Sequence, residues 1–417
     1  MATASKTRAA FPALQAVFTR LRPRRSAITL DVGAAGVRAC QLRGCADGAG
    51  CTARLEDALH IERMPRTDDL LTAESPAGPA PDGRLLRRLI GQACFAGRDI
   101  NLVLSPPDVE FVPIRLPEPM LTQPPERAEA ALKWEVAREM RIAAEELEVR
   151  SWRLPPSRGQ PANVMAVALR TALALQWCDA FAAQGLCLKR LDVSPCALVR
   201  AARQFWPPGT DELWGVLDLG LLHATLTLVA GEAPVYVRSL AVTAHDWTCR
   251  IAEAFEVNYT AAEQMKRTHG VRGEAVVAAA PGSPPGAGGG ELAAVFAGVL
   301  REGLRNLATE ISRCFGYVMQ SYAEHSVRRL VLTGGGAALR GLPSVLETEL
   351  DIPVALLTDS PADGGGVGGP LARPAGAAAR LCPDVRDAVA FGGALLDLDV
   401  GGLRVAPTQV RNAEGRT

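Results

Sequence analysis

The sequence has no long apolar run, no excess of charge of one sign and no cysteines at a metal-binding spacing. No apolar run approaches the ~20 residues that cross a bilayer, and the basic first 25 residues lack the continuous apolar centre of a secretory signal. Because 45 basic and 45 acidic residues cancel, bulk charge does not favour nucleic-acid binding. The ten dispersed cysteines are typical of small buried residues in a reducing compartment. These absences predict a soluble, cytoplasmic protein.

Three glycine turns, each at the end of an apolar β-run, are the most informative feature present. The first run is Ile28–Gly33, which contains Asp31-Val32-Gly33, and the second is Val216–Gly220, which contains Asp218-Leu219-Gly220. The third run, Leu330–Thr333, enters a triple glycine. At such turns the backbone can approach a ligand with no side chain in the way.

The pairing of the first two turns suggests a nucleotide site. Exposed backbone N–H groups in a tight turn bind anions, and an Asp at each of two strand ends can hold a hydrated divalent cation. A lone Asp-x-Gly is more often a plain hairpin. Its repetition at Asp31 and Asp218 makes that alternative weaker, because two buried carboxylates without a partner are costly. The repetition also suggests an internal duplication.

A helix between the second turn and the triple glycine carries Glu263, Lys266 and Arg267. Glu263 and Lys266 share one helix face, where they could offer an acceptor to a ribose and a cation to an adenine ring. The alternative is a solvated ion pair on an exposed helix. The triple glycine, Gly334 to Gly336, leaves room for a flat ligand against bare backbone.

The order of these motifs resembles the superfamily of actin, sugar kinases and chaperone ATPases. Within it, the chain is similar to the PilM family of type IV pilus assembly proteins, which are related to FtsA. The segments that carry this closer resemblance span about Ile28 to Leu398; they include RAEAALKWEVAREM, AQGLCLKRLDVSPCALVRA, EAFEVNYTAAEQMKR and RRLVLTGGGAALRGLPSVLETELDIPV.

The resemblance implies an α/β, actin-like fold: a duplicated, ribonuclease H-like, two-lobed architecture with a central nucleotide cleft and a small inserted subdomain. The implied division is a basic tail 1–26, a first lobe 27–208 with the inserted subdomain at about 109–188, a second lobe 209–398 with a subdomain at about 247–305, and a tail 399–417. The small-residue helix 387–398 is expected to pack back on the first lobe.

The resemblance further implies that ATP and Mg²⁺ are the ligands, with the cation held through water by Asp31 and Asp218. The implied nucleotide-binding positions are Asp31, Gly33, Ala34, Ala35, Gly36, Arg38, Asp218, Gly220, Leu221, Leu222, Glu263, Lys266, Arg267, Gly334, Gly335 and Gly336. Hydroxyl side chains are usual at Ala34 and Ala35, and small residues at Leu221 and Leu222. ATP binding with weak or no hydrolysis is therefore expected, and no catalytic residue is nominated.

The implied function is a scaffold of pilus assembly, peripheral to the inner membrane. Its implied partner is a bitopic membrane protein similar to PilN, whose N-terminal cytoplasmic peptide would bind near residues 109–188, first of all on Leu132 to Val149. Self-association is a further possibility. The alternatives are a sugar or acetate kinase, a filament-forming protein similar to FtsA, and an adaptor of a related pilus or type II secretion system.

Overall fold

The computed structural model describes residues 25–47, 50–62, 91, 95–157, 162–206, 208–209, 212–271, 289–322, 326–359 and 384–398. Residues 1–24 of the expected tail 1–26, the expected tail 399–417, and the Gly/Pro-rich residues 280–288 and 362–379 lie outside these residues. Among the helices that are described, none is long and apolar enough to cross a membrane.

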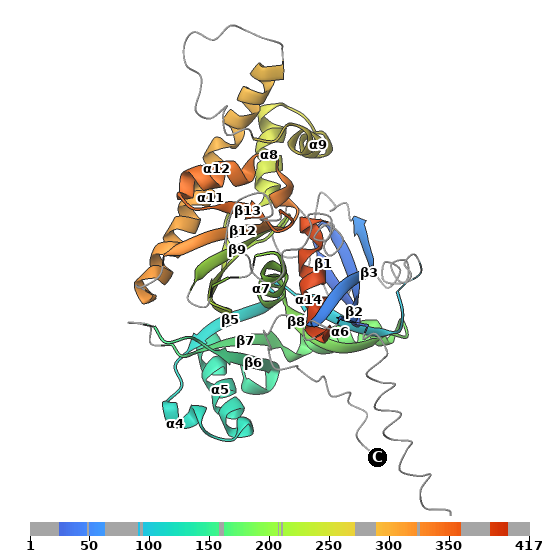
Figure 1. Ribbon diagram of the computed structural model, residues 1–417, viewed down its shortest axis with the longest axis vertical. Coiled ribbons are helices and arrows are strands. Elements are labelled where there is room, and N and C mark those ends of the chain that lie inside the picture. The colour runs from blue at the N-terminus through green and yellow to red at the C-terminus, as the bar shows by residue number, and fades with distance from the viewer. Residues whose placement is uncertain are drawn as a thin grey trace, which may run out of the picture.

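Two five-stranded sheets with the same strand order form the two lobes (Figure 1). The first has the order β3-β2-β1-β4-β8; its strands are β1 (Ile28–Gly33), β2 (Gly36–Asp47), β3 (Gly50–Glu62), β4 (Asp99–Leu104) and β8 (Cys187–Val193). The second has the order β11-β10-β9-β12-β13; its strands are β9 (Leu213–Leu219), β10 (Ala224–Ala230), β11 (Ala233–Leu240), β12 (Val327–Thr333) and β13 (Val354–Leu356).

Pairing directions repeat as well as strand order. In each sheet the first three strands in the chain form an antiparallel meander. The fourth strand pairs in parallel with the first, and the fifth pairs in parallel with the fourth. The central strands β1 and β9 are apolar and almost wholly buried, as strands covered on both faces are. The Asp-x-Gly turns therefore occupy corresponding places in two copies of one topology, which is the internal duplication that their repetition suggested.

Two helices, α7 (Ser194–Phe205) and α14 (Ala388–Leu398), lie between the sheets and pack on each other (Figure 1). α14 also packs on β1, β2 and β4 of the first sheet, and α7 contacts β9, β10 and β11 of the second. Both helices are almost entirely buried. Their crossing point has no room for a side chain, because a Cβ on Gly392 would overlap the carbonyl oxygen of Ala197.

The ion pair of Asp192 and Arg200 lies beside this crossing, and both side chains are almost completely buried. The Arg200 Nε also donates to the carbonyl oxygen of Gly392, at 3.0 Å. A buried charge is tolerated when it is paired and hydrogen-bonded. The pair thereby links the end of β8, helix α7 and helix α14 at the centre of the molecule.

A smaller antiparallel sheet, of order β5-β7-β6, is inserted after β4. Its elements are β5 (Val109–Ile114), α4 (Glu118–Leu121), α5 (Pro125–Met140), η1 (Ala144–Glu146), β6 (Leu147–Arg153) and β7 (Val164–Arg170). It has its own core, in which Leu132, Val136 and Val149 are buried. The following helix α6 (Thr171–Ala182) packs instead in the core of the first sheet, through Trp177 and Phe181.

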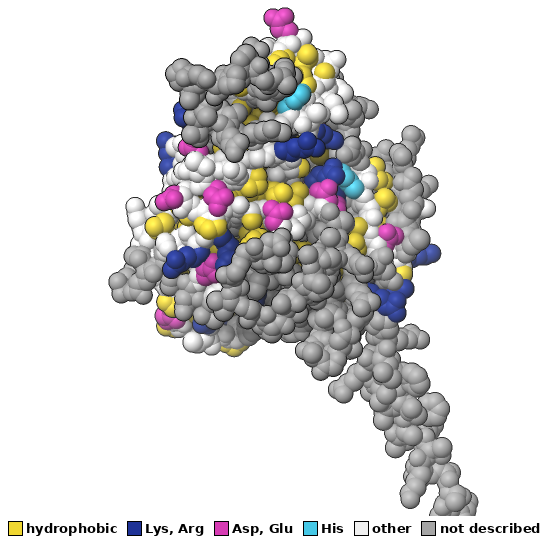
Figure 2. Space-filling view, turned by 45° about the horizontal axis from the view of Figure 1, so that its top comes forward, with side chains coloured by type: hydrophobic (Ala, Val, Ile, Leu, Met, Phe, Trp, Pro, Cys, Tyr) yellow, Lys and Arg dark blue, Asp and Glu magenta, His cyan; other side chains and the backbone are white. Residues whose placement is uncertain are grey.

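The remaining helices belong to the second lobe: α8 (Ala244–Ala254), α9 (Tyr259–His269), α11 (Gly289–Ser321), η2 (Gly336–Ala338), α12 (Leu342–Leu350) and the short η4 (Val385–Asp387) that precedes α14. α8 begins with a reciprocal capping box between Thr243 and Asp246. On the face that Figure 2 turns forward, the described acidic and basic side chains are interspersed, as the balanced composition suggests.

Candidate functional site

The first Asp-x-Gly turn is a tight hairpin with Ala34 and Ala35 at its tip, between paired residues Gly33 and Gly36. Asp31 lies opposite Arg38 in the β1–β2 register, and the Arg38 Nη1 is 3.3 Å from the Asp31 Oδ2. Both side chains are buried. The Nε of Arg38 is buried and has no hydrogen-bond partner among the described residues.

The second turn is longer and is fixed from outside. The Gly220 N–H donates to the His223 carbonyl oxygen at 2.9 Å, and a Cβ at Gly220 would press on that oxygen. The carbonyl oxygens of Gly220 and Leu221 accept from the first N–H groups of α8, at Ala244 (3.3 Å) and His245 (3.0 Å). Leu221 and Leu222 are half-buried. The turn and the helix therefore form one rigid piece.

The triple glycine closes over the second turn. Gly334 has a φ of 85°, and a Cβ on it would collide with the Asp218 Oδ1. The Thr333 hydroxyl donates to the same oxygen at 3.4 Å. A Cβ on Gly336 would lie 3.0 Å from the Cβ of Leu219, whereas a Cβ on Gly335 would meet no atom within 4 Å. Two of the glycines are thus needed for close packing and the third faces open space.

The sequence did not nominate η4, yet this segment joins the same cleft. The Gly334 N–H donates to the Val385 carbonyl oxygen at 3.2 Å. The Asp384 carboxylate accepts from the Arg386 backbone N–H at 2.8 Å and from its guanidinium at 2.6 Å. Asp387 follows in the same turn. η4 comes directly after a Gly/Pro/Ala-rich stretch near the end of the chain, so no motif pointed to it.

Electrostatic interactions indicate that these carboxylates lie near one another. Burial raises the pKa of Asp218 to about 6, and the Asp31 charge adds to the shift. Burial and the charges of Asp384 and Asp31 likewise raise the pKa of Asp387 to about 6, although the charges of Arg38 and Arg386 lower it. Asp31, on the opposite lobe from Asp218, is therefore close enough to act on it. The two acidic hairpins face each other.

The cluster carries an excess of negative charge. Asp31, Asp218, Asp384 and Asp387 outnumber Arg38 and Arg386, which leaves a formal charge of −2 when all are ionised. A cation would relieve the repulsion. No described group of three or more acidic, His or Cys side chains could ligate a metal directly. The excess of acidic charge around Asp31 and Asp218 is what a hydrated divalent cation would neutralise.

Lys266 of α9 is buried and Glu263 is half-buried, whereas Arg267 is exposed. The Lys266 Nζ contacts the Ala244 carbonyl oxygen (3.0 Å), the Thr248 hydroxyl (2.7 Å) and the Glu263 carboxylate (2.6 Å), which uses all three of its N–H groups. Arg267 contacts the other Glu263 oxygen at 3.0 Å. The interpretation of Glu263 and Lys266 as a solvated pair is wrong, because hydrogen bonds to Ala244 and Thr248 of α8 hold the Lys266 side chain in the interface of the two helices.

Comparison with known proteins connects this geometry to one family. The family described as "Type IV pilus assembly protein PilM" matches residues 86–275. A solved PilM–PilN type IV pilus biogenesis complex is 25% identical, with a TM-score of 0.67, over 90% of this chain and 99% of that chain. The chain is PilM-like. The actin-like fold predicted from the sequence is confirmed, with both lobes on one sheet topology.

Two further similar structures lie outside the PilM family. The ethanolamine utilization protein EutJ from Carboxydothermus hydrogenoformans is 13% identical, with a TM-score of 0.42, and the match covers 90% of each chain. MreB5 of Spiroplasma citri, solved with AMPPNP, is 12% identical, with a TM-score of 0.42, over 88% of this chain and 95% of that chain. None of the curated proteins matches the chain significantly.

The inserted subdomain contains the range Leu132 to Val149, on whose faces the partner's peptide was first expected. Leu132 and Val149 themselves are buried in the core of the small sheet. Only the exposed side chains of this range are available to a partner. Trp134 of α5 is 65% exposed and Leu175 of α6 is 51% exposed. The spacing of apolar residues along α5 predicts a helix, but it does not show which of the apolar side chains remains exposed.

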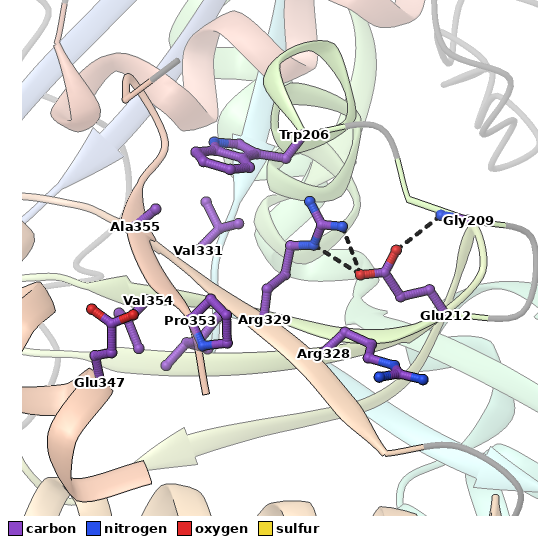
Figure 3. Close-up of a pocket in the computed structure, with 11 residues that line it drawn as sticks. Trp206, Gly209, Glu212, Arg328, Arg329, Val331, Glu347, Pro353, Val354 and Ala355 are labelled. Carbon is purple, nitrogen blue, oxygen red and sulfur yellow. Dashed lines mark hydrogen bonds and ion pairs between the residues drawn. The ribbon is translucent and has the colours of Figure 1, made fainter. Parts of the chain in front are cut away.

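A pocket of about 640 Å³ lies at the end of the second sheet opposite Asp218 (Figure 3). In Figure 3 the Arg329 side chain lies between Trp206 and Glu212. Its guanidinium is 5.9 Å from the centre of the indole ring and 2.8 Å from the Glu212 carboxylate. Glu212 also accepts from the Gly209 N–H at 2.9 Å. These contacts anchor the segment between the lobes to β12, at a place separate from the acidic cleft.

Proposed function

We propose that this PilM-like protein is a nucleotide-binding scaffold of type IV pilus assembly that binds the N-terminal cytoplasmic peptide of a bitopic, PilN-like inner-membrane partner. The observation that carries the proposal is the facing pair of acidic hairpins in a chain that aligns with PilM over 90% of its length. The partner would hold the protein at the inner membrane, because the scaffold binds a protein that is itself anchored there.

Each lobe contributes a distinct part of the nucleotide site. Asp31 and Asp218 would hold Mg²⁺, which would neutralise charge between the carboxylates and the phosphates. Backbone N–H groups of the two turns that have no other acceptor, and the Arg38 guanidinium, would bind the phosphates. The bare backbone at Gly335 receives the adenosine.

Weak or absent hydrolysis follows from the side chains at the turns. Ala34 and Ala35 have no hydroxyl to position a phosphate or a water, and Leu221 and Leu222 place apolar groups at the second turn. Backbone donors suffice for binding, whereas hydrolysis needs an oriented water. Nucleotide then acts by biasing the two lobes between open and closed arrangements, and this couples the cleft to partner binding.

Replacing Gly335 by leucine is expected to weaken ATP binding at least about tenfold without destabilising the fold. Gly335 has helical dihedrals (φ −65°, ψ −33°) and open space around a built Cβ, so a leucine fits the apo protein. The same side chain would fill the adenosine position. Isothermal titration with ATP and Mg²⁺, together with a thermal melt, measures both effects.

The matched control is Gly298→Ala on α11, which also has open space and lies outside the cleft. It should leave ATP affinity unchanged. If wild-type protein gives no heat with ATP, the nucleotide part of the proposal is wrong; if Gly335→Leu binds as well as wild type, the adenosine lies elsewhere.

Replacing Trp134 by alanine is expected to weaken binding of the partner's N-terminal peptide about tenfold or more, because exposed Trp residues dominate interface energies. Fluorescence anisotropy with a labelled N-terminal peptide of a PilN-like protein measures the change. Glu129→Ala, at an exposed position of the same helix, is the control. Equal affinities for wild type and Trp134→Ala would move the peptide away from α5.

A further inference from the structure

A second recognition surface lies on the other lobe, where strand β11 meets helix α11. β11 is an edge strand: it pairs with β10, and no other described strand pairs with its free side. A hollow of about 820 Å³ separates the end of β11 from α11. It is lined by Tyr236, Arg238, Ala241, Val242, Asn306, Thr309, Glu310, Arg313, Cys314 and Tyr317.

The floor of this hollow is apolar and aromatic. The rings of Tyr236 and Tyr317 lie 5.4 Å apart, and Tyr317 remains 55% exposed. Val242 is only partly buried, although it borders the main core. An exposed aromatic patch is typical of an interaction site, and an unpaired strand edge can pair with another chain. The two features together favour a binding surface.

The rim of the hollow is basic. Arg238 and Arg313 are exposed, and neither forms an ion pair with any residue in the described part of the chain. The one acidic side chain in the lining, Glu310, is already engaged, since its carboxylate accepts from the Ala241 N–H at 3.1 Å. Arg238 interacts with the Tyr236 hydroxyl and with the Glu310 charge, so the two guanidiniums exceed the one carboxylate and leave a net positive rim that complements an acidic ligand.

One end of β11 is closed. The Trp152 indole N–H of the inserted subdomain donates to the Pro234 carbonyl oxygen at 2.8 Å, and Pro234 itself has no N–H to offer. A strand added at this edge can therefore use only the half of β11 from Tyr236 onward. That half is the one that borders the hollow.

We propose that the β11–α11 groove docks an acidic, extended segment of a partner protein as an added strand. Its backbone pairs with the free edge of β11, alternate apolar side chains enter the hollow against Tyr236 and Tyr317, and its carboxylates meet Arg238 and Arg313. This surface is separate from the acidic cleft and from α5, so the proposal does not depend on the function proposed above.

The test is selection of short random peptides displayed on phage against the full chain, followed by anisotropy with the enriched peptides. We expect the enriched sequences to alternate β-branched or aromatic residues with Asp or Glu. Arg313→Glu should weaken their binding at least about tenfold. Arg301→Glu, an exposed Arg on the same helix outside the hollow, should not. Peptides N-methylated on the paired edge should lose binding.

Arg238→Glu and Tyr317→Ala repeat the test from the strand and from the floor, so that a folding defect in one variant does not decide the result. Enriched peptides without acidic residues would overturn the proposal, as would equal binding by Arg313→Glu or by the N-methylated peptides. If wild type self-associates in sedimentation and Arg313→Glu abolishes the association, the groove is a contact between copies of this chain, and the proposal is likewise wrong.

Discussion

Alanine at position 392 is expected to destabilise the protein by about 3 kcal/mol or more, the upper end of the range for overpacked cores. A Cβ there would overlap the backbone oxygen of Ala197, and backbone cannot rotate away as a side chain can. Relief requires α7 and α14 to move apart, which would also stretch the Arg200–Gly392 hydrogen bond. Thermal and urea unfolding of wild type and Gly392→Ala measure the loss.

The control for this prediction is Gly298→Ala. Gly298 is exposed and lies away from the ends of α11, and a Cβ built on it would meet no atom within 4 Å. Alanine there should stabilise by about 0.5–1 kcal/mol through helix propensity. The opposite signs of the two Gly→Ala substitutions separate close packing from propensity. A Gly392→Ala variant as stable as wild type would mean that the helices do not cross as closely as described.

The fold was largely predictable, because its signals are local. The apolar β-runs ending at Gly33 and Gly220 and the run that enters the triple glycine all form the expected strands. Strand β11 gave no such signal: it contains Pro234, and Arg238 and Ser239 near its end are exposed, as is typical of edge strands. Edge strands are specified by their neighbours more than by their own residues.

The candidate site was only partly predictable, for a related reason. Asp31 and Asp218 each carry a local turn signature, so their approach across the cleft could be inferred from two short motifs. Asp384 and Asp387 have no such signature. They lie near the acidic turns because the Gly334 N–H donates a hydrogen bond to the Val385 carbonyl oxygen of η4. The fate of Lys266 likewise depended on Thr248 in another helix. Long-range packing, rather than sequence spacing, places these groups.

Asn in place of Asp218 is expected to stabilise the apo protein at pH 7.5 while weakening binding of ATP with Mg²⁺ at least about tenfold. The pKa of Asp218 is about 6 in the fold, against 3.8 for an unperturbed Asp. The native state therefore holds this proton more tightly than the unfolded state does. Stability falls as pH rises from about 4 to 6, and the full penalty, about 3 kcal/mol at most, remains above pH 6.

Thermal melts between pH 5 and 8 should show that wild type gains stability as the pH falls and that Asp218→Asn flattens this dependence. Asp384→Asn is the matched control. Burial would raise the pKa of Asp384, but its bonds to Arg386 outweigh burial and lower it. The charge of Asp384 therefore stabilises the fold, and its loss at pH 7.5 should destabilise the protein.

An Asp218→Asn protein less stable than wild type at pH 7.5 would show that the ionised carboxylate is favourably held without a cation. Unchanged affinity for ATP with Mg²⁺ would show that Asp218 does not serve the metal. A carboxylate that costs stability and yet improves ligand binding is the behaviour expected of a residue placed for function rather than for folding.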